Sequence, residues 1–213
     1  MLIGWSVVRI HSPAPVYTYF AVILSGAKNF FFKMDFKTVL ENLLRQFNES
    51  KIRYALIGGF ALGFWGVGRA TVDLDFLIHC DDMEKVNGFM KELGYECKYK
   101  TENVSQYVSP LRVYGEVDFL HAFREASLEM LKRSEEKEVF GSLKIKVLRP
   151  EDIIGLKFQA IKNNPSREGW EIEDIESLLS IHGKNLDWSL VEKYSKILDV
   201  EELYKKIRRG REK

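Results

Sequence analysis

The sequence predicts an α/β (α+β) fold in which a mixed β-sheet flanked by helices is followed by a helical C-terminal part. Short, mostly apolar runs that end in glycine or in polar turns indicate the strands of the sheet. From residue 149 onward the apolar residues recur instead at intervals of three and four, which is the period of helices. The 213 residues allow one domain with additions or two small domains.

Composition and charge narrow the class of protein. Hydrophobic residues make up 46% of the chain and charged residues 30%, which is ordinary for a soluble globular protein. The 32 lysines and arginines nearly balance the 31 acidic residues, so the net charge of +1 does not indicate a general nucleic-acid binder. Two cysteines provide neither a disulfide framework nor a zinc quartet, and they fit the reducing cytoplasm.

Residues 1–33 differ from the rest because they contain no acidic residue. Their apolar stretch, residues 16–24, is far shorter than the roughly 20 residues that a membrane-spanning helix needs, so we expect no membrane association. Residues 8–11, Val-Arg-Ile-His, can be encoded by GTT CGA ATC CA, the T-arm consensus of a transfer-RNA gene. Our hypothesis is that residues 1–33 are an extension absent from the native protein, created by a start codon assigned upstream of Met34.

Residues 34–148 are predicted to form the core. A packing helix is expected over residues 35–50, where the apolar side chains follow the helical period. Two buried strands are predicted at 53–58 and 72–78, because both runs are short, apolar and close to glycines. The segment 60–67 between them is expected to be a helix or a turn.

A second helix of the core is expected over residues 81–93. Asp81 or Asp82 is placed to cap its N-terminus, and Gly94 is placed to end it. The remaining strands of the core are predicted at 96–100, 112–120 and 143–148.

Residues 149–213 are predicted to form the helical region. Pro150 suits the first turn of a helix, where the missing N–H costs nothing. Helices are predicted over 149–163, 168–181, 188–197 and 201–208. The sequence has no low-complexity linker between the two parts, so it gives their boundary only approximately, near residue 149.

Acidic residues on the predicted strands are the strongest chemical signal. Asp73 and Asp75 alternate with apolar residues, so both carboxylates project from one face of a strand. Asp118 on a later strand can complete the set; Glu116 has the same strand parity, but its neighbours are less apolar. Alternation is also typical of a solvated face, although unpaired charges are costly in so apolar a run. Converging carboxylates repel one another unless a cation lies among them, and Mg²⁺ prefers such oxygen ligands.

Glycines and a basic residue lie next to these aspartates. Gly58 and Gly59 end the first strand, and without side chains they allow a phosphate to approach the backbone. A glycine pair is also common in plain turns. Arg69 offers several donors in a rigid fork to a triphosphate or to a pyrophosphate leaving group, and Thr71 lies between it and the aspartates.

At these residues the sequence resembles the nucleotidyltransferase superfamily of the DNA polymerase beta type. Its pattern of a glycine pair, an Asp-x-Asp strand and a third aspartate matches Gly58, Gly59, Asp73, Asp75 and Asp118. Within the superfamily, Gly-Gly-Phe-Ala-Leu-Gly and Gly-Arg-Ala-Thr-Val-Asp-Leu-Asp look like the abortive-infection (AbiEii-type) toxin nucleotidyltransferases and related small proteins. The likeness covers roughly residues 35–182.

The resemblance implies a nucleotidyltransferase fold and transfer of a nucleotide from a nucleoside triphosphate with two Mg²⁺ ions. It implies that Asp73, Asp75 and Asp118 hold the metal, with Asp118 near the acceptor hydroxyl. Lys157 matches a family lysine that reaches the phosphates; an internal ion pair with Asp174 or Glu151 is the alternative. In some relatives the acceptor is tRNA, and the protein is a toxin with a separate antitoxin partner.

Two other functions remain open at this point. The chain can be a catalytically silent copy of the fold that binds nucleotides or another protein. It can also be an enzyme that modifies a small molecule, such as an antibiotic. The sequence identifies neither the triphosphate nor the acceptor.

Overall fold

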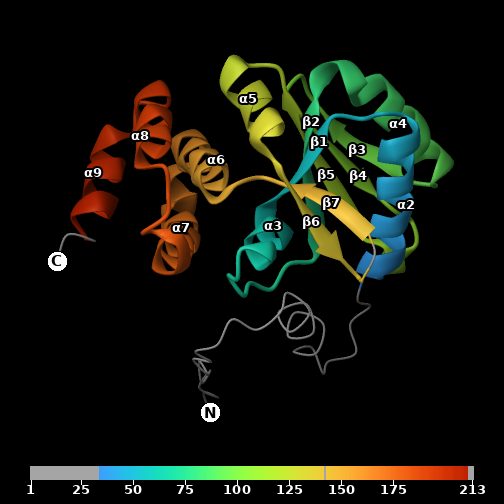
Figure 1. Cartoon of the computed structure of the whole chain (residues 1–213). Coiled ribbons are helices and arrows are strands. Elements are labelled where there is room, and N and C mark those ends of the chain that lie inside the picture. Colours follow the sequence, from blue (N-terminus) through green and yellow to red (C-terminus); the bar gives the residue numbers. More distant parts are fainter. Residues whose placement is uncertain (1–33, 142, 211–213) are drawn as a thin grey trace, which may run out of the picture.

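The computed structural model describes residues 34–141 and 143–210, so the predicted extension over residues 1–33 lies outside the described residues (Figure 1). Seven strands of the described part form one mixed sheet in the order β3-β4-β5-β2-β1-β7-β6. The strands are β1 (Tyr54–Ile57), β2 (Asp73–His79), β3 (Glu96–Lys100), β4 (Val104–Val108), β5 (Glu116–Ala122), β6 (Glu135–Val139) and β7 (Leu143–Val147).

Helices lie on both sides of this sheet. Figure 1 shows α2 and α4 against one side, while α6 to α9 gather beyond the other. Among the described residues, no helix combines the length and apolarity needed to cross a membrane. The helices are α2 (Phe36–Glu49), α3 (Gly58–Phe64), α4 (Met83–Glu92), α5 (Glu125–Arg133), α6 (Pro150–Asn163), α7 (Glu168–His182), α8 (Trp188–Ile197) and α9 (Glu201–Arg209).

Aromatic side chains form the centre of the core. The ring of Phe47 on α2 lies 4.5 Å from that of Tyr54 and 5.3 Å from that of Phe76, measured between centroids. Phe76 on β2 also stacks on Phe119 of β5 at 6.1 Å. Phe76 lies directly opposite Phe119, and Tyr54 lies opposite Ile78, two residues after Phe76, so the three strand residues share one face of the sheet and this face packs into the core. The aspartates on the intervening positions of β2 and β5 therefore face the other side.

The pairing of the central strands brings the predicted acidic residues together. β2 and β5 are parallel, with Asp75 directly opposite Asp118. β1 is antiparallel to β2 and pairs its last residue, Ile57, with Asp75. Because neighbouring strands lie about 4.8 Å apart, this register sets two carboxylates side by side, next to the point where the chain leaves β1.

The fold class predicted from the sequence is confirmed: a mixed sheet with flanking helices precedes a helical C-terminal part. Three elements are absent from the prediction, namely β4, α5 and β6. β6 reads Glu-Glu-Lys-Glu-Val and forms one edge of the sheet, where charged residues discourage pairing with other chains. The helix α5 has no side-chain cap at its N-terminus, so the capping pattern that often indicates a helix start is missing there.

Two local predictions need correction. The carboxylate of Asp82 does not cap α4; it accepts hydrogen bonds from the backbone N–H and the Nε–H of Arg53, at 3.0 and 2.8 Å. The strand expected over 112–120 begins only at Glu116, because residues 112–114 form a single 3₁₀ turn. The positive φ of Gly94 after α4 agrees with its predicted role in ending that helix.

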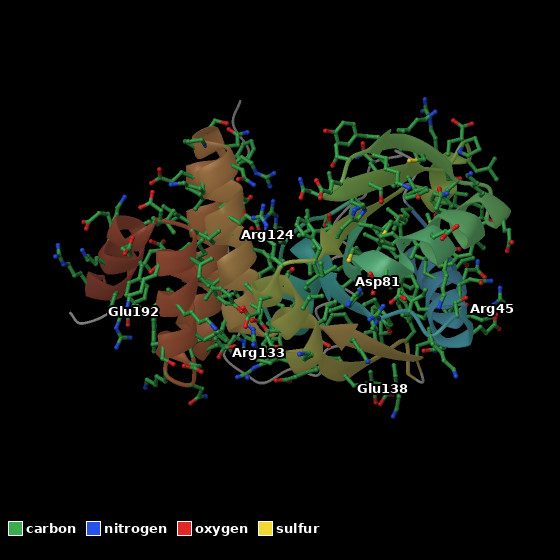
Figure 2. All side chains as sticks on the ribbon, turned by 90° about the horizontal axis from the view of Figure 1, so that it is seen from above. Arg45, Asp81, Arg124, Arg133, Glu138 and Glu192 are labelled. Carbon is green, nitrogen blue, oxygen red and sulfur yellow. The ribbon has the colours of Figure 1, made fainter. Side chains whose placement is uncertain are left out.

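Polar contacts attach the helical region to the sheet. Arg133 of α5 donates to Asp152 of α6 at 2.8 Å, and Figure 2 shows Arg133 where the two parts meet. His182 Nε2 of α7 lies 2.7 Å from the carbonyl of Trp65, which belongs to the core. The indole N–H of Trp65 donates at 2.7 Å to the carbonyl of Leu148, the last residue before the helical region. We propose that the chain divides near residue 149 into a core and a helical region, and that these contacts hold the two parts in their relative orientation.

Candidate active site

The three predicted aspartates lie in one pocket between the sheet and the helical region. The pocket has a volume of about 730 Å³, and Asp73, Asp75 and Asp118 all line it. Glu116, the alternative to Asp118, does not line the pocket; its carboxylate accepts a hydrogen bond from Gln106 at 3.4 Å instead. The other predicted site residues that line the pocket are Gly58, Gly59, Arg69, Thr71 and Lys157.

Crowding of these carboxylates makes each harder to ionise. Burial, together with the charges of Asp118 and Asp73, raises the pKa of Asp75 to about 7. Burial and the charge of Asp73 raise the pKa of Asp118 to about 6. Burial also raises the pKa of Asp73. A site that only had to be stable would not gather three acids in this way, so the cluster is typical of a functional site.

The carboxylates fit a hard divalent cation. One oxygen of Asp118, Oδ1, is buried and has no hydrogen-bond partner, which is rare for a native polar atom. All three residues offer oxygen donors, as Mg²⁺ prefers. Among the described residues, the carboxylate oxygens of these three aspartates are not all within 4.8 Å of one another. A metal ion bound between the three carboxylates would offset their mutual repulsion and would require them to move closer together.

Gly58 is required where the chain passes Asp75. Its φ is +66°, a conformation that side chains disfavour, and a Cβ there would lie 2.7 Å from the Asp75 Cγ and closer still to Oδ2. Gly59 is similarly tight, since a Cβ would lie 2.7 Å from the Cβ of Thr71. The hydroxyl of Thr71 donates to the carbonyl of Asp73 at 3.3 Å and so supports the loop before β2. The glycine pair thus lets the backbone approach the carboxylates.

The basic side chains of Arg69, Lys157 and Arg167 line the same pocket as the aspartates and form its basic wall. The Nζ of Lys157 lies 2.6 Å from a carboxylate oxygen of Asp174 and 2.8 Å from one of Glu171. Arg69, from the loop before β2, also forms an ion pair with Asp174. Arg167 pairs with Glu171 at 2.6 Å. The buried lysine is therefore held between two acids. Of the two partners considered in the alternative interpretation of Lys157, Asp174 is present and Glu151 is not.

Glu171 was not singled out from the sequence, although it lines the pocket and binds Lys157. Glu151, the other partner considered for Lys157, instead accepts the backbone N–H of Asp187 at 2.9 Å. The spacing of Glu171 and Asp174 by three places both on one face of α7. That spacing was readable from the sequence, and so was the helix that carries Lys157, but the packing of the two helices against each other was not.

The shared carboxylate of Asp174 leads to a stability prediction. Asp174→Asn is expected to lower the free energy of unfolding by about 1–3 kcal/mol, because Lys157 and Arg69 both lose a charged partner. The exposed neighbour Glu173 provides the matched control, and Glu173→Gln is expected to change stability by less than about 0.5 kcal/mol. Urea unfolding checks both values. Equal stability of the two variants would show that Asp174 does not hold the basic wall in place.

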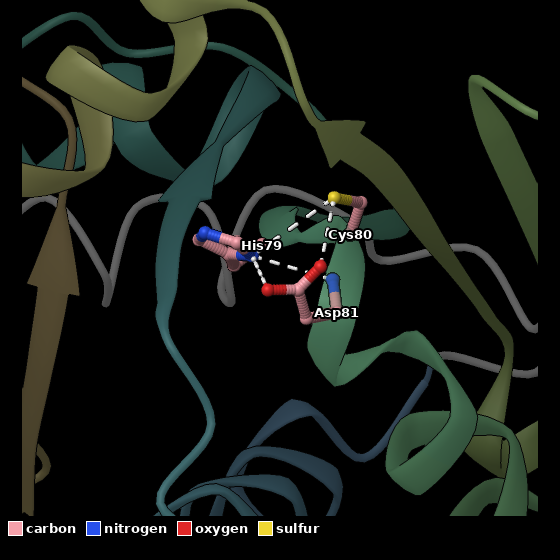
Figure 3. Close-up of side chains that lie close together, drawn as sticks. All are labelled: His79, Cys80 and Asp81. Carbon is pink, nitrogen blue, oxygen red and sulfur yellow. Dashed lines mark hydrogen bonds and ion pairs between the residues drawn. The ribbon is translucent and has the colours of Figure 1, made fainter.

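Another group of possible metal ligands lies at the opposite end of β2. The ligand atoms of His79, Cys80 and Asp81 lie within 4.8 Å of one another, and Figure 3 shows them converging. They are consecutive residues, and the Asp81 carboxylate also lies 3.6 Å from Arg53. Six residues of strand, about 20 Å, separate His79 from Asp73, so this group is remote from the pocket.

A known protein family matches most of the chain. Residues 36–209 match the model of a family described as "Nucleotidyl transferase of unknown function (DUF2204)". The match covers well over half of the chain. A search of curated proteins found no match.

Solved structures share the fold at low sequence identity. The solution structure of the antibiotic-resistance factor ANT(2'')-Ia is 14% identical with a TM-score of 0.57, covering 81% of this chain and 96% of that one. The crystal structure of ANT(2'')-Ia with adenylyl-2''-tobramycin is 15% identical with a TM-score of 0.56, covering 77% and 97%. The lincomycin-bound lincosamide antibiotic adenylyltransferase LnuA is 16% identical, covers 70% and 99%, and has a TM-score of 0.48. At these identities the likeness concerns the fold alone.

Proposed function

Because the chain belongs to this family of nucleotidyl transferases, whose model matches residues 36–209, we propose that it transfers a nucleoside monophosphate from a nucleoside triphosphate to a hydroxyl acceptor. The observation that carries the proposal is the set of three carboxylates with raised pKa values in one pocket. The basic wall lines the same pocket, which suits a polyphosphate neutralised by metal ions.

Asp73, Asp75 and Asp118 are the residues that would hold divalent metal. Bound there, two Mg²⁺ ions would neutralise the three carboxylates and offset charge on the triphosphate. Because they lack side chains, Gly58 and Gly59 let the backbone lie directly against the side chains of Asp75 and Thr71, and their backbone N–H groups would bind phosphate oxygens there. Lys157 and Arg69 line the pocket, and they would bind the leaving pyrophosphate in exchange for part of their ion pairs with Asp174 and Glu171.

The reaction itself is a displacement at phosphorus. The acceptor oxygen forms a bond to the α-phosphorus, and the bond from that phosphorus to the oxygen bridging to the β-phosphate breaks. The nucleoside monophosphate moves to the acceptor, and pyrophosphate leaves. Asp118 lines the pocket and, when ionised, its carboxylate can accept the proton of the acceptor hydroxyl. Positioning and charge neutralisation supply most of the catalysis.

The acceptor is not identified by the family. A tRNA acceptor, toxin activity and an antitoxin partner follow from the AbiEii-type resemblance and remain predictions. The two structures with TM-scores above 0.5 belong to an antibiotic-resistance factor, which supports the fold and leaves the acceptor of this chain open.

A transfer assay tests the proposed function. The whole chain is incubated with Mg²⁺, each α-labelled nucleoside triphosphate, and either total RNA or a small-molecule extract; Asp73→Asn serves as the control. We expect label to move into one acceptor fraction with the wild type and not with Asp73→Asn. Equal labelling by the variant would contradict the roles given to the aspartates, and the absence of both label and triphosphate binding would favour a silent copy of the fold.

A further inference from the structure

A crevice lies beside the active-site pocket, at the junction of the two parts. Its volume is about 80 Å³, several times the roughly 10–15 Å³ that a single water needs. Leu120, Leu156 and Gln159 line both the crevice and the pocket, so the two spaces are neighbours. A molecule bound across these three residues would have one end in the crevice and the other in the pocket.

The walls of the crevice are mainly apolar. Phe123 and Met130 come from the sheet side, while Leu156 and Ile197 come from α6 and α8. Two of these side chains are exposed although large and hydrophobic: Phe123 is 36% and Ile197 is 54% exposed. Apolar surface left open beside an active site is typical of a place where a ligand binds.

Charge in the crevice is sparse. Among the described residues that line it, Arg124 alone is charged at neutral pH, because burial lowers the pKa of His121 and raises that of Tyr194. Both ring nitrogens of His121 already have partners, at 3.0 Å from Ser105 Oγ and 2.8 Å from the carbonyl of Glu102. Figure 2 shows Arg124 at the junction of the two parts.

Cations in the neighbouring pocket are already paired. Its lining includes Arg69, Lys157 and Arg167, whose acidic partners are Asp174 and Glu171. The same lining carries the carboxylates of Asp73, Asp75 and Asp118. An RNA strand brings one negative charge per nucleotide and is normally met by an array of lysines and arginines. Crevice and pocket together leave Arg124 as the basic residue not engaged with those acids.

We propose that this crevice is the acceptor subsite, and that the acceptor is a small non-nucleotide molecule with a compact apolar group a few bonds from its hydroxyl. The inference rests on the proposed nucleotidyl transfer and specifies its acceptor. The positions of Leu120 and Leu156, which line both the crevice and the pocket, support this acceptor subsite. Leu120 lies two residues after Asp118 on the same face of β5, about 6.6 Å along the strand, and Leu156 directly precedes Lys157. An apolar group against these leucines leaves the hydroxyl within reach of the Asp118 carboxylate.

The test uses the whole chain, Mg²⁺, α-labelled nucleoside triphosphates and three acceptor probes. The probes are 2-phenylethanol, which carries an apolar group, glycerol, which does not, and total RNA. We expect 2-phenylethanol to accept label at least about tenfold faster than glycerol, since filling an apolar pocket discriminates by this factor or more. Saturation-transfer NMR measures binding of 2-phenylethanol independently of turnover.

Two matched lysine variants test whether 2-phenylethanol binds in the crevice. Ile197→Lys places a charge in the crevice at an already exposed position and is expected to weaken binding and labelling of 2-phenylethanol about tenfold. Ile181→Lys, at a 50% exposed isoleucine that does not line the crevice, is expected to change both by less than about twofold.

Three results would overturn the inference. One is equal labelling of glycerol and 2-phenylethanol, another is labelling of RNA alone, and the third is equal effects of the two lysine variants. Magnesium-dependent triphosphate binding, measured alongside, separates the two proposals. If that binding persists while 2-phenylethanol neither binds nor accepts label, the crevice is not the acceptor subsite and the proposed function stands. If triphosphate binding is absent, the proposed function fails and the acceptor role of the crevice fails with it.

Discussion

Asp75→Asn is expected to lower the rate of nucleotidyl transfer by at least about 10³-fold. Asp75 lies between the other two carboxylates, opposite Asp118 in the sheet and two residues after Asp73. An amide removes the negative charge that holds a cation there but keeps the shape of the side chain. The measurement is the rate of label transfer at saturating Mg²⁺ and triphosphate.

The same substitution is expected to stabilise the metal-free protein. The folded state raises the pKa of Asp75 to about 7, so ionisation of this residue opposes folding. The wild type therefore loses stability as the pH rises from about 4, the pKa in the unfolded chain, to about 7. At pH 8 we expect Asp75→Asn to be more stable by roughly 1–3 kcal/mol, with the difference vanishing below about pH 4.

Urea unfolding in EDTA at pH 4 and at pH 8 measures this difference. Mg²⁺ is expected to stabilise the wild type and to have much less effect on the variant, because ligand binding to the folded state alone raises its stability. A variant less stable than the wild type at pH 8 without metal would contradict the assignment of Asp75 to a strained, functional position.

Gly58→Ala is expected to damage both the stability and the activity of the protein. The added Cβ would lie 2.7 Å from the Asp75 Cγ at a backbone φ of +66°. We expect the free energy of unfolding to fall by about 2–4 kcal/mol, because neither the strand end nor the carboxylate can move freely. Transfer is expected to fall about 10²-fold, since the displaced carboxylate no longer faces Asp118.

Gly68 provides the control for this substitution. It lies in the loop before β2, and a Cβ there would meet no heavy atom within 4 Å. Gly68→Ala is expected to change stability by less than about 0.5 kcal/mol and to leave the transfer rate unchanged. If the two alanine variants behave alike, the contact between Gly58 and Asp75 does not shape the site.

Local patterns were enough to predict most of the fold. The helix predicted over 188–197 has those bounds in the structure, because Asp187 caps it and its apolar residues follow the helical period. The alternation around Asp73 and Asp75 predicted that both share a face of β2, which the pairing with β5 bears out. In both cases the information lies within a few residues of the chain.

Other features depended on contacts between distant segments. The charged edge strand β6 is stabilised by its pairing with β7, so its own residues do not indicate a strand. The hydrogen bond from Lys157 to Glu171 joins α6 and α7, so it could be predicted only if the packing of these two helices were known. The crevice beside the active site is likewise formed by α5 and α8, two helices that meet only in the folded chain.

Calorimetric titration with a non-hydrolysable α,β-methylene triphosphate tests the central claim most directly, because it needs no knowledge of the acceptor. It is performed with the whole chain, with and without Mg²⁺, for the wild type, Asp73→Asn and Gly68→Ala. We expect the wild type and Gly68→Ala to bind the analogue in a magnesium-dependent manner, and Asp73→Asn to bind it at least tenfold more weakly. Binding by Asp73→Asn equal to that of the wild type, or binding that does not change with Mg²⁺, would contradict a metal-dependent triphosphate site at these carboxylates.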